Sequence, residues 1–198
     1  TLGGQLLGGL DNGSAGANSN VGKGGDITLN LNAKSSISTA GDGAYGILAQ
    51  SIGGGGGLSG DVSSVAQGSS PLLTNGVIVG GNGDGGNVTI GLAGTSITTS
   101  GNYAPAIFAQ SVGGGGGLMA LDKVLEFGSA GGSGVGGTVA ITLTGSTVKA
   151  TGTDGAPAIL VSSNASAGAS QAVRITIDQT SLVQGGASAL AGGSTMSG

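Results

Sequence analysis

Four short segments of the chain alternate hydrophobic and polar residues with a period of two. Period-two alternation is typical of β-strands that bury one face and expose the other. A second hydrophobic row recurs downstream, at Ile37, Ile97, Val148 and Leu182. The pattern therefore predicts at least two β-strands in each of four copies. The hydrophobic positions of the alternating segments are Ile27, Leu29 and Leu31; Val88, Ile90 and Leu92; Val139, Ile141 and Leu143; and Val173, Ile175 and Ile177.

A third segment follows in each copy and is hydrophobic at most positions. Such strands carry apolar side chains on both faces, so we expect something to cover their outer side. A glycine separates the second segment from the third in every copy, and we expect it to supply a positive φ angle at a tight corner. These glycines are Gly41, Gly101, Gly152 and Gly186, and the third segments are residues 45–52, 105–112, 157–161 and, more weakly, 187–191.

The segments belong to an internal repeat. Residues 24–58 read GGDITLNLNAKSSISTAGDGAYGILAQSIGGGGGL, and residues 85–118 read GGNVTIGLAGTSITTSGNYAPAIFAQSVGGGGGL. Three short strands joined by tight turns form one coil of a parallel β-helix. Stacking coils about 4.8 Å apart turns the hydrophobic rows into continuous internal ladders. We predict an all-β parallel β-helix (β-solenoid) of about four coils. A β-sandwich or propeller-like array, or a glycine-rich fold without β-structure, remains as an alternative.

We treat residues 1–198 as a single repeat array. The chain starts at Thr1 and ends at Gly198 without a signal-peptide pattern, which we interpret as a fragment of a longer chain. The predicted coils are approximately residues 24–52, 85–112, 136–163 and 172–191, with long glycine-rich excursions at 53–83 and 113–135.

Each excursion opens with five glycines in matched surroundings. Gln50 precedes Gly53–Gly57, and Gln110 precedes Gly113–Gly117 at the same spacing. Three interpretations stay open: recent duplication, a strip without side chains that lets backbones pack closely, or a cradle for a ligand. The two glutamines would form an amide ladder between coils. The second excursion also contains a run, residues 118–127, whose apolar spacing is compatible with one face of a helix.

Composition excludes several classes of function. Glycine supplies 48 of 198 residues and charged residues only 7%, yet the hydrophobic fraction of 37% and the mean hydropathy of +0.32 indicate a folded chain. Without cysteine or histidine there are no disulfides, no thiolate metal sites and no imidazole general base. Five basic residues and a net charge of −4 argue against nucleic-acid binding.

Candidate chemistry is sparse. No phosphate-loop motif occurs, and the acidic residues do not form the carboxylate pair that glycoside hydrolysis needs. A calcium ion at Asp84 or Asp26 has no positive support, and Arg174 with Asp178 suggests a surface charge pair. Tyr45 and Tyr103 are expected to cap the coil edge, with carbohydrate stacking as the alternative. We therefore predict no enzyme activity, no catalytic residues, no metal site and no cofactor.

The repeat resembles the passenger repeats of large proteobacterial autotransporters. The residues that carry the resemblance are Ser-Ile-x-Thr-x-Gly-Asp followed by Ala-Gln-Ser-Ile and the pentaglycine, most closely at 25–58 and 86–118. The resemblance implies a right-handed parallel β-helix on the bacterial cell surface, type V secretion, and a translocator β-barrel elsewhere in the full-length chain. The repeat positions to which it points are Gly41, Gln50, Gly53, Gly57, Gly101, Gln110, Gly113, Gly117 and Gly152.

The functional expectation is an extracellular structural or adhesive stalk, with a host-surface or glycan ligand left unidentified. The alternative is a filament or biofilm-fibre subunit that associates through its coil ends or its glycine-rich strips. An ice- or glycan-binding solenoid is a third hypothesis, for which Thr28, Thr89, Thr142 and Thr176 would form one outward column.

Overall fold

The structure is a computed structural model that describes residues 22–59, 81–121, 124–129, 132–165 and 170–186. These residues form β-strands and turns without a helix, and none of them belongs to a helix that could span a bilayer. The strands are β1 (Ile27–Leu31), β2 (Ser36–Thr39), β3 (Ile47–Ile52), β4 (Gly56–Ser59), β5 (Val88–Ala93), β6 (Ser96–Thr99), β7 (Ile107–Val112), β8 (Gly116–Leu121), β9 (Val124–Ser129), β10 (Val139–Thr144), β11 (Thr147–Ala150), β12 (Ile159–Asn164), β13 (Val173–Ile177) and β14 (Leu182–Gln184).

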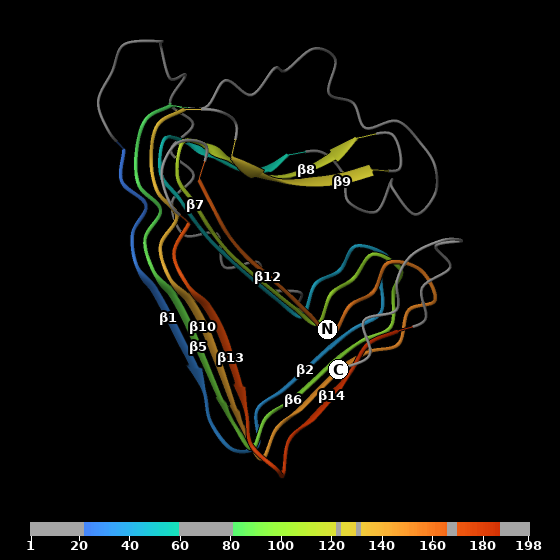
Figure 1. Ribbon diagram of the computed structural model, residues 1–198. Helices are drawn as coiled ribbons and strands as arrows, with labels where there is room; N and C mark the ends of the chain where they lie inside the picture. Colours follow the sequence, from blue (N-terminus) through green and yellow to red (C-terminus); the bar gives the residue numbers. More distant parts are fainter. Residues whose placement is uncertain (1–21, 60–80, 122–123, 130–131, 166–169, 187–198) are drawn as a thin grey trace.

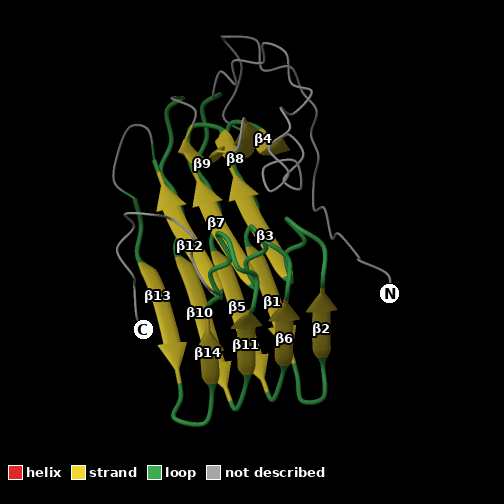
Figure 2. Ribbon diagram, turned by 90° about the vertical axis from the view of Figure 1, so that its right-hand side faces the viewer, coloured by secondary structure: helices red, strands yellow, loops and turns green. Residues whose placement is uncertain are grey.

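Three sheets contain only parallel strands, and each takes one strand from successive repeats. Sheet A has the order β1-β5-β10-β13, sheet B the order β2-β6-β11-β14, and sheet C the order β3-β7-β12. Figure 1 shows the strands of each sheet nearly behind one another, and Figure 2 shows them side by side. The fold is all-β with parallel sheets, as predicted, and is compatible with a β-solenoid.

The core lies between the sheets and follows the predicted hydrophobic rows. Parallel pairing aligns Ile27 with Val88, Val88 with Val139, and Val139 with Val173, and the next two rows of sheet A align in the same way. Side chains of β5 and β10 that point inward are almost completely buried. The period-two pattern therefore placed the core of sheet A correctly, because a one-residue error would have turned every side chain outward.

The fourth member of the second row is Val183 and not Leu182. In sheet B, Ile37 aligns with Ile97 and Ile97 with Val148, as predicted, but Val148 aligns with Val183. Val183 packs against the core, whereas Leu182 is 46% exposed. Both residues are apolar, so the sequence pattern alone did not distinguish the inward position from its neighbour.

The corner glycines do not have positive φ angles, so that prediction was wrong. The left-handed position lies two or three residues later, at Gly43 (φ 65°), Tyr103 (φ 51°) and Gly155 (φ 53°). A second left-handed position joins sheets A and B and contains Lys34 (φ 75°), with Gly94 and Gly145 in the next repeats. The glycines at 101, 152 and 186 meet a different requirement, which is the close approach of the backbone of the preceding repeat.

The described residues of the helix-compatible run, 118–121 and 124–127, belong to strands. β8 pairs in parallel with β4 and antiparallel with β9, so sheet D has the order β4-β8-β9. A ten-residue helix is marginal by itself, whereas β8 continues a backbone ladder that has already begun at Gly116 and Gly117. Figure 1 shows β8 and β9 beyond sheet C, and β9 approaches β12. The weak fourth copy of the third segment, residues 187–191, lies outside the described residues.

Candidate functional site

A column of buried serines links each coil to the next on sheet C. The Ser51 hydroxyl donates to the Gly25 carbonyl (2.7 Å) and accepts the Gly86 N–H (2.9 Å). Ser111 repeats this bridge between Gly86 and Gly137, at 2.7 Å on each side. Gly86 and Gly137 are buried, so the Ser111 hydroxyl satisfies one carbonyl and one amide that the core would otherwise leave without a partner.

The third repeat continues this column although it lacks the Gln-Ser pair. The Ser163 hydroxyl donates to the Gly137 carbonyl (2.8 Å) and accepts the Gln171 N–H (3.2 Å). A Cβ atom on Gly24 or Gly136 would come within 2.6 Å of a serine hydroxyl oxygen. The repeated Gly-Gly before each first strand thus makes room for the serine column. Sequence reasoning missed this column, although matched serines and matched Gly-Gly pairs were its visible signal.

Gln50 and Gln110 form the predicted amide contact. The Gln50 Nε2 donates to the Gln110 Oε1 (3.0 Å), and the Gln110 Nε2 lies 3.5 Å from the Asn164 Oδ1. The Gln110 side chain is fully buried. Ser162 takes the next position in register, and its buried hydroxyl has no hydrogen-bond partner among the described residues. The amide column therefore has two glutamines and then ends on the asparagine.

Gln110→Leu is expected to lower the free energy of unfolding by about 1–3 kcal/mol, because the Gln50 amide loses its acceptor within a buried sheet. Chemical denaturation of the purified variant measures this effect. Gln184→Leu, at an exposed position on β14, is the matched control and should change stability by no more than about 0.5 kcal/mol. The double variant Gln50→Leu/Gln110→Leu should recover most of the loss, and a double variant less stable than Gln110→Leu would contradict the amide contact.

Asp26 and Asp84, the two aspartates considered for calcium, accept hydrogen bonds from the backbone, and so does Asp42. The Asp26 Oδ1 accepts the Asn87 N–H (2.7 Å), the Asp42 Oδ1 accepts the Asn102 N–H (2.8 Å), and the Asp84 Oδ1 accepts the Val135 N–H (3.0 Å). In each case the donor belongs to the next repeat. Among the described residues, no three acidic side chains gather closely enough to hold a metal ion. Each of these carboxylates therefore links a corner of one coil to the backbone of the next by a hydrogen bond.

Asp178 does not form the expected charge pair with Arg174. Residues four apart in a strand are about 13 Å apart, whereas that spacing brings side chains together only in helices. Asp178 instead accepts hydrogen bonds from the Ser181 hydroxyl (2.6 Å), the Thr180 hydroxyl (2.8 Å) and the Gly145 N–H (3.2 Å). The Ser181 and Thr180 hydrogen bonds lower the pKa of the Asp178 carboxyl from 3.8 to about 2.

This lowered pKa predicts a pH-dependent contribution to stability. The Asp178 carboxylate stabilises the fold fully above about pH 4, and the contribution is lost as pH falls through about 2. The difference in unfolding free energy between the wild type and Asp178→Asn should therefore shrink as pH falls from about 5 to 2. Thermal unfolding of both proteins across that range measures it. A difference that stays constant over the range would contradict the role of the ionised carboxylate.

The corner glycines form a column of backbones that leaves no room for side chains. A Cβ atom on Gly101 would overlap the Gly41 carbonyl, one on Gly152 would overlap the Gly101 carbonyl, and one on Gly186 would overlap the Gly152 carbonyl. Gly41 differs, since the nearest atom to its Cβ would be that of Ala44 at 3.6 Å. The column therefore requires glycine in every repeat that stacks on an earlier one.

The two pentaglycines stack on each other. The Gly115 N–H donates to the Gly53 carbonyl (2.6 Å), and the Gly116 N–H donates to the Gly55 carbonyl (3.1 Å). Gly57 aligns with Gly117 in the β4–β8 pair, and a Cβ atom on Gly113 would overlap the backbone of Gly134 and Val135. The geometry favours the interpretation of a strip without side chains, because its backbones approach each other within the chain.

The outer face of sheet A does not carry the predicted threonine column. Thr28 and Thr89 align with each other, but their neighbours are Ala140 and Arg174. Thr142 and Thr176 belong to the adjacent row, which contains Asn30 and Gly91. Thr142 and Thr176 therefore lie two residues further along their strands than the positions that align with Thr28 and Thr89. A regular threonine array for binding ice is therefore broken.

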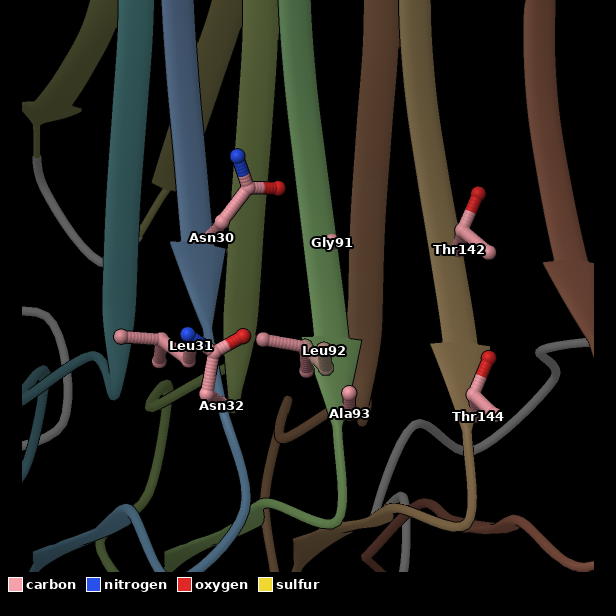
Figure 3. Close-up of a pocket in the computed structure, with 8 residues that line it drawn as sticks. All are labelled: Asn30, Leu31, Asn32, Gly91, Leu92, Ala93, Thr142 and Thr144. Carbon is pink, nitrogen blue, oxygen red and sulfur yellow. The ribbon is translucent and has the colours of Figure 1, made fainter.

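An open depression lies on this face. It lies over Gly91 and Ala93, between Asn30 on one side and Thr142 on the other (Figure 3). Its lining has asparagine and threonine side chains but no carboxylate or basic group. These residues offer hydrogen bonds to a polar surface but no acid, base or nucleophile pair for catalysis.

The two tyrosines have separate structural contacts. The Tyr45 ring lies 6.0 Å from the Phe108 ring, and burial raises the pKa of its hydroxyl. The Tyr103 hydroxyl donates to the Asp154 Oδ2 (2.9 Å), and this hydrogen bond raises the pKa of Tyr103. Tyr45 is thus half-buried against sheet C, and Tyr103 is tied to the next repeat.

The polar side chains of the described coils mainly join one coil to another and do not converge on a cavity. Serine hydroxyls, glutamine amides and aspartate carboxylates all form hydrogen bonds between one coil and the next. Comparison with known proteins finds no matching family model, no similar curated protein and no similar solved structure.

Proposed function

We propose that the chain is a non-catalytic, surface-exposed structural or adhesive passenger region of an autotransporter, built as a right-handed parallel β-helix of about four coils. In this role the coils form a rigid support that holds its outer faces away from the cell. The translocator barrel, the type V secretion route and the extracellular location are parts of the same proposal.

The observation that carries the proposal is the use of polar groups between coils. Ser111 bridges two glycine backbones, Gln110 contacts Gln50, and Asp84 accepts a backbone N–H of the following repeat. An enzyme of this fold would need acidic or nucleophilic groups directed toward a substrate cleft. Here those groups stabilise the stack, which supports a scaffold.

Two further arguments support the finer features of the proposal. A parallel connection that returns to the same sheet is right-handed in nearly all proteins, and β1 reaches β5 through such a connection. β13 and β14 add a last strand to sheets A and B, which supports a fourth coil.

Antibodies raised against the purified chain test the location. Intact cells that produce the full-length protein should bind the antibody, and external protease should remove the signal without lysis. The gene should encode a C-terminal series of alternating strands about ten residues long, as outer-membrane barrels require. Antibody binding only after lysis would contradict the surface location, and a gene without barrel-type strands would contradict the secretion route.

A further inference from the structure

The last strand of sheet A leaves an apolar row exposed. Val173, Ile175 and Ile177 are 44%, 42% and 48% exposed, although they align with Val139, Ile141 and Leu143, which are at most 1% exposed. The residue types are equivalent in the two strands. Within the part of the chain that the structure describes, β13 pairs on one side only, with β10, and sheet C has three strands where sheet A has four.

The first strand of sheet A provides a matching edge at the opposite end of the stack (Figure 2). Ile27, Leu29 and Leu31 of β1 are half-buried and have the same spacing as the row on β13. Every neighbouring pair within sheet A is parallel and in register. A β1 strand placed beside β13 would therefore repeat an interface that the fold already makes three times.

Charged residues complement each other across the same junction. Arg174 on the outer face of β13 would lie opposite Thr28, diagonally from Asp26, at a distance that a long side chain spans. At the corner between sheets A and B, Asp178 binds the Gly145 N–H, and Lys34 occupies the left-handed position equivalent to Gly145. In such a junction, Arg174 and Asp178 of the last coil would each face a group of opposite charge on the first.

We infer that the edge formed by β13 and β14 binds the first coil of a second copy of this chain, head to tail and in register with β1 and β2. The apolar row on β13 would then be covered by Ile27, Leu29 and Leu31. This inference rests on the proposed scaffold function, since it extends the same stack from one molecule to the next.

Disulfide trapping between two single-cysteine variants tests the register, because the natural chain has no cysteine. Thr176 and Asn30 point outward from the two edges and would lie opposite each other in the junction. Isotopically labelled Thr176→Cys mixed with unlabelled Asn30→Cys should yield mainly the mixed disulfide. Thr142→Cys, exposed in the middle of the same sheet, is the matched control and should not cross-link to Thr176→Cys. Thr176→Cys homodimers as the main product, or cross-linking no greater than in the control, would overturn the inference.

A second variant tests the apolar row by sedimentation velocity. Ile175→Lys should weaken self-association by about tenfold or more, because the junction would bury its charge. Thr176→Lys, on the opposite face of the same strand, should associate nearly as the wild type does. Equal association of Ile175→Lys and the wild type would also overturn the inference. An internal disulfide in the Thr89→Cys/Ala140→Cys variant, whose two positions are paired within one molecule, would show that the scaffold survives even when the junction fails.

Discussion

Replacing Gly101 with alanine is expected to lower the free energy of unfolding by about 3 kcal/mol or more. The new methyl group would overlap the Gly41 carbonyl oxygen and carbon and lie close to the Asp42 nitrogen. All three are backbone atoms, so a change of rotamer cannot relieve the overlap. Only separation of the first two coils could, and it would disturb the Ser51 and Gln50 bonds that join them. Chemical denaturation followed by circular dichroism measures the loss.

Gly41→Ala is the matched control for this prediction. It changes the same residue type at the same corner, but its Cβ would have only an ordinary contact with Ala44 at 3.6 Å. We expect a change of about 0.5 kcal/mol or less. Equal loss in the two variants would show that glycine is needed for local conformation and not for stacking, which would contradict the column.

Ser111→Ala is expected to cost about 2–4 kcal/mol, since it leaves the Gly86 carbonyl and the Gly137 N–H unsatisfied in the core. The serine is fully buried, and the hydrogen bonds on both sides are 2.7 Å long. The hydroxyl that is removed is only about the size of a methylene group, so the lost packing alone would lower the free energy of unfolding little. The effect therefore measures the two backbone groups and not the packing of the side chain.

Ser96→Ala serves as the control because Ser96 lies on an exposed position of β6. Ser163→Ala should fall between the two, since its acceptor role involves the exposed Gln171. Equilibrium unfolding should show the largest loss of stability in Ser111→Ala, a smaller loss in Ser163→Ala and the smallest in Ser96→Ala. A Ser111→Ala protein as stable as Ser96→Ala would contradict the serine bridge.

The sequence predicted features that depend on alternation. The rows of sheet A and the pairing of Gln50 with Gln110 follow from side chains that repeat with the period of the strand. The slip from Leu182 to Val183 shows the limit of this signal, because two adjacent apolar residues satisfy the same pattern. The threonine column failed for a related reason, since threonines recur on both adjacent outward rows.

Features that depend on contacts between coils could not be predicted from local patterns. The local pattern predicts a positive φ at the corner glycines, whereas the structure requires glycine at 101, 152 and 186 because a Cβ atom there would overlap the backbone of the preceding repeat. Similarly, the Asp26 and Asp84 carboxylates each accept an N–H of the next repeat, a contact between repeats that no local pattern indicates. Only the stacking distance between coils brings these groups together.

Disulfide trapping within one molecule tests the central claim, which is parallel, in-register stacking of the repeats. Thr89 and Ala140 lie directly opposite each other on the outer face of sheet A, so Thr89→Cys/Ala140→Cys should form an internal disulfide under mild oxidation. Thr89→Cys/Thr142→Cys differs by two residues in register, at a Cα separation of about 8 Å that a disulfide does not span. Mass spectrometry of proteolytic fragments should find the disulfide in the first variant and not in the second. An internal disulfide in the second variant only, or in neither, would contradict the stack.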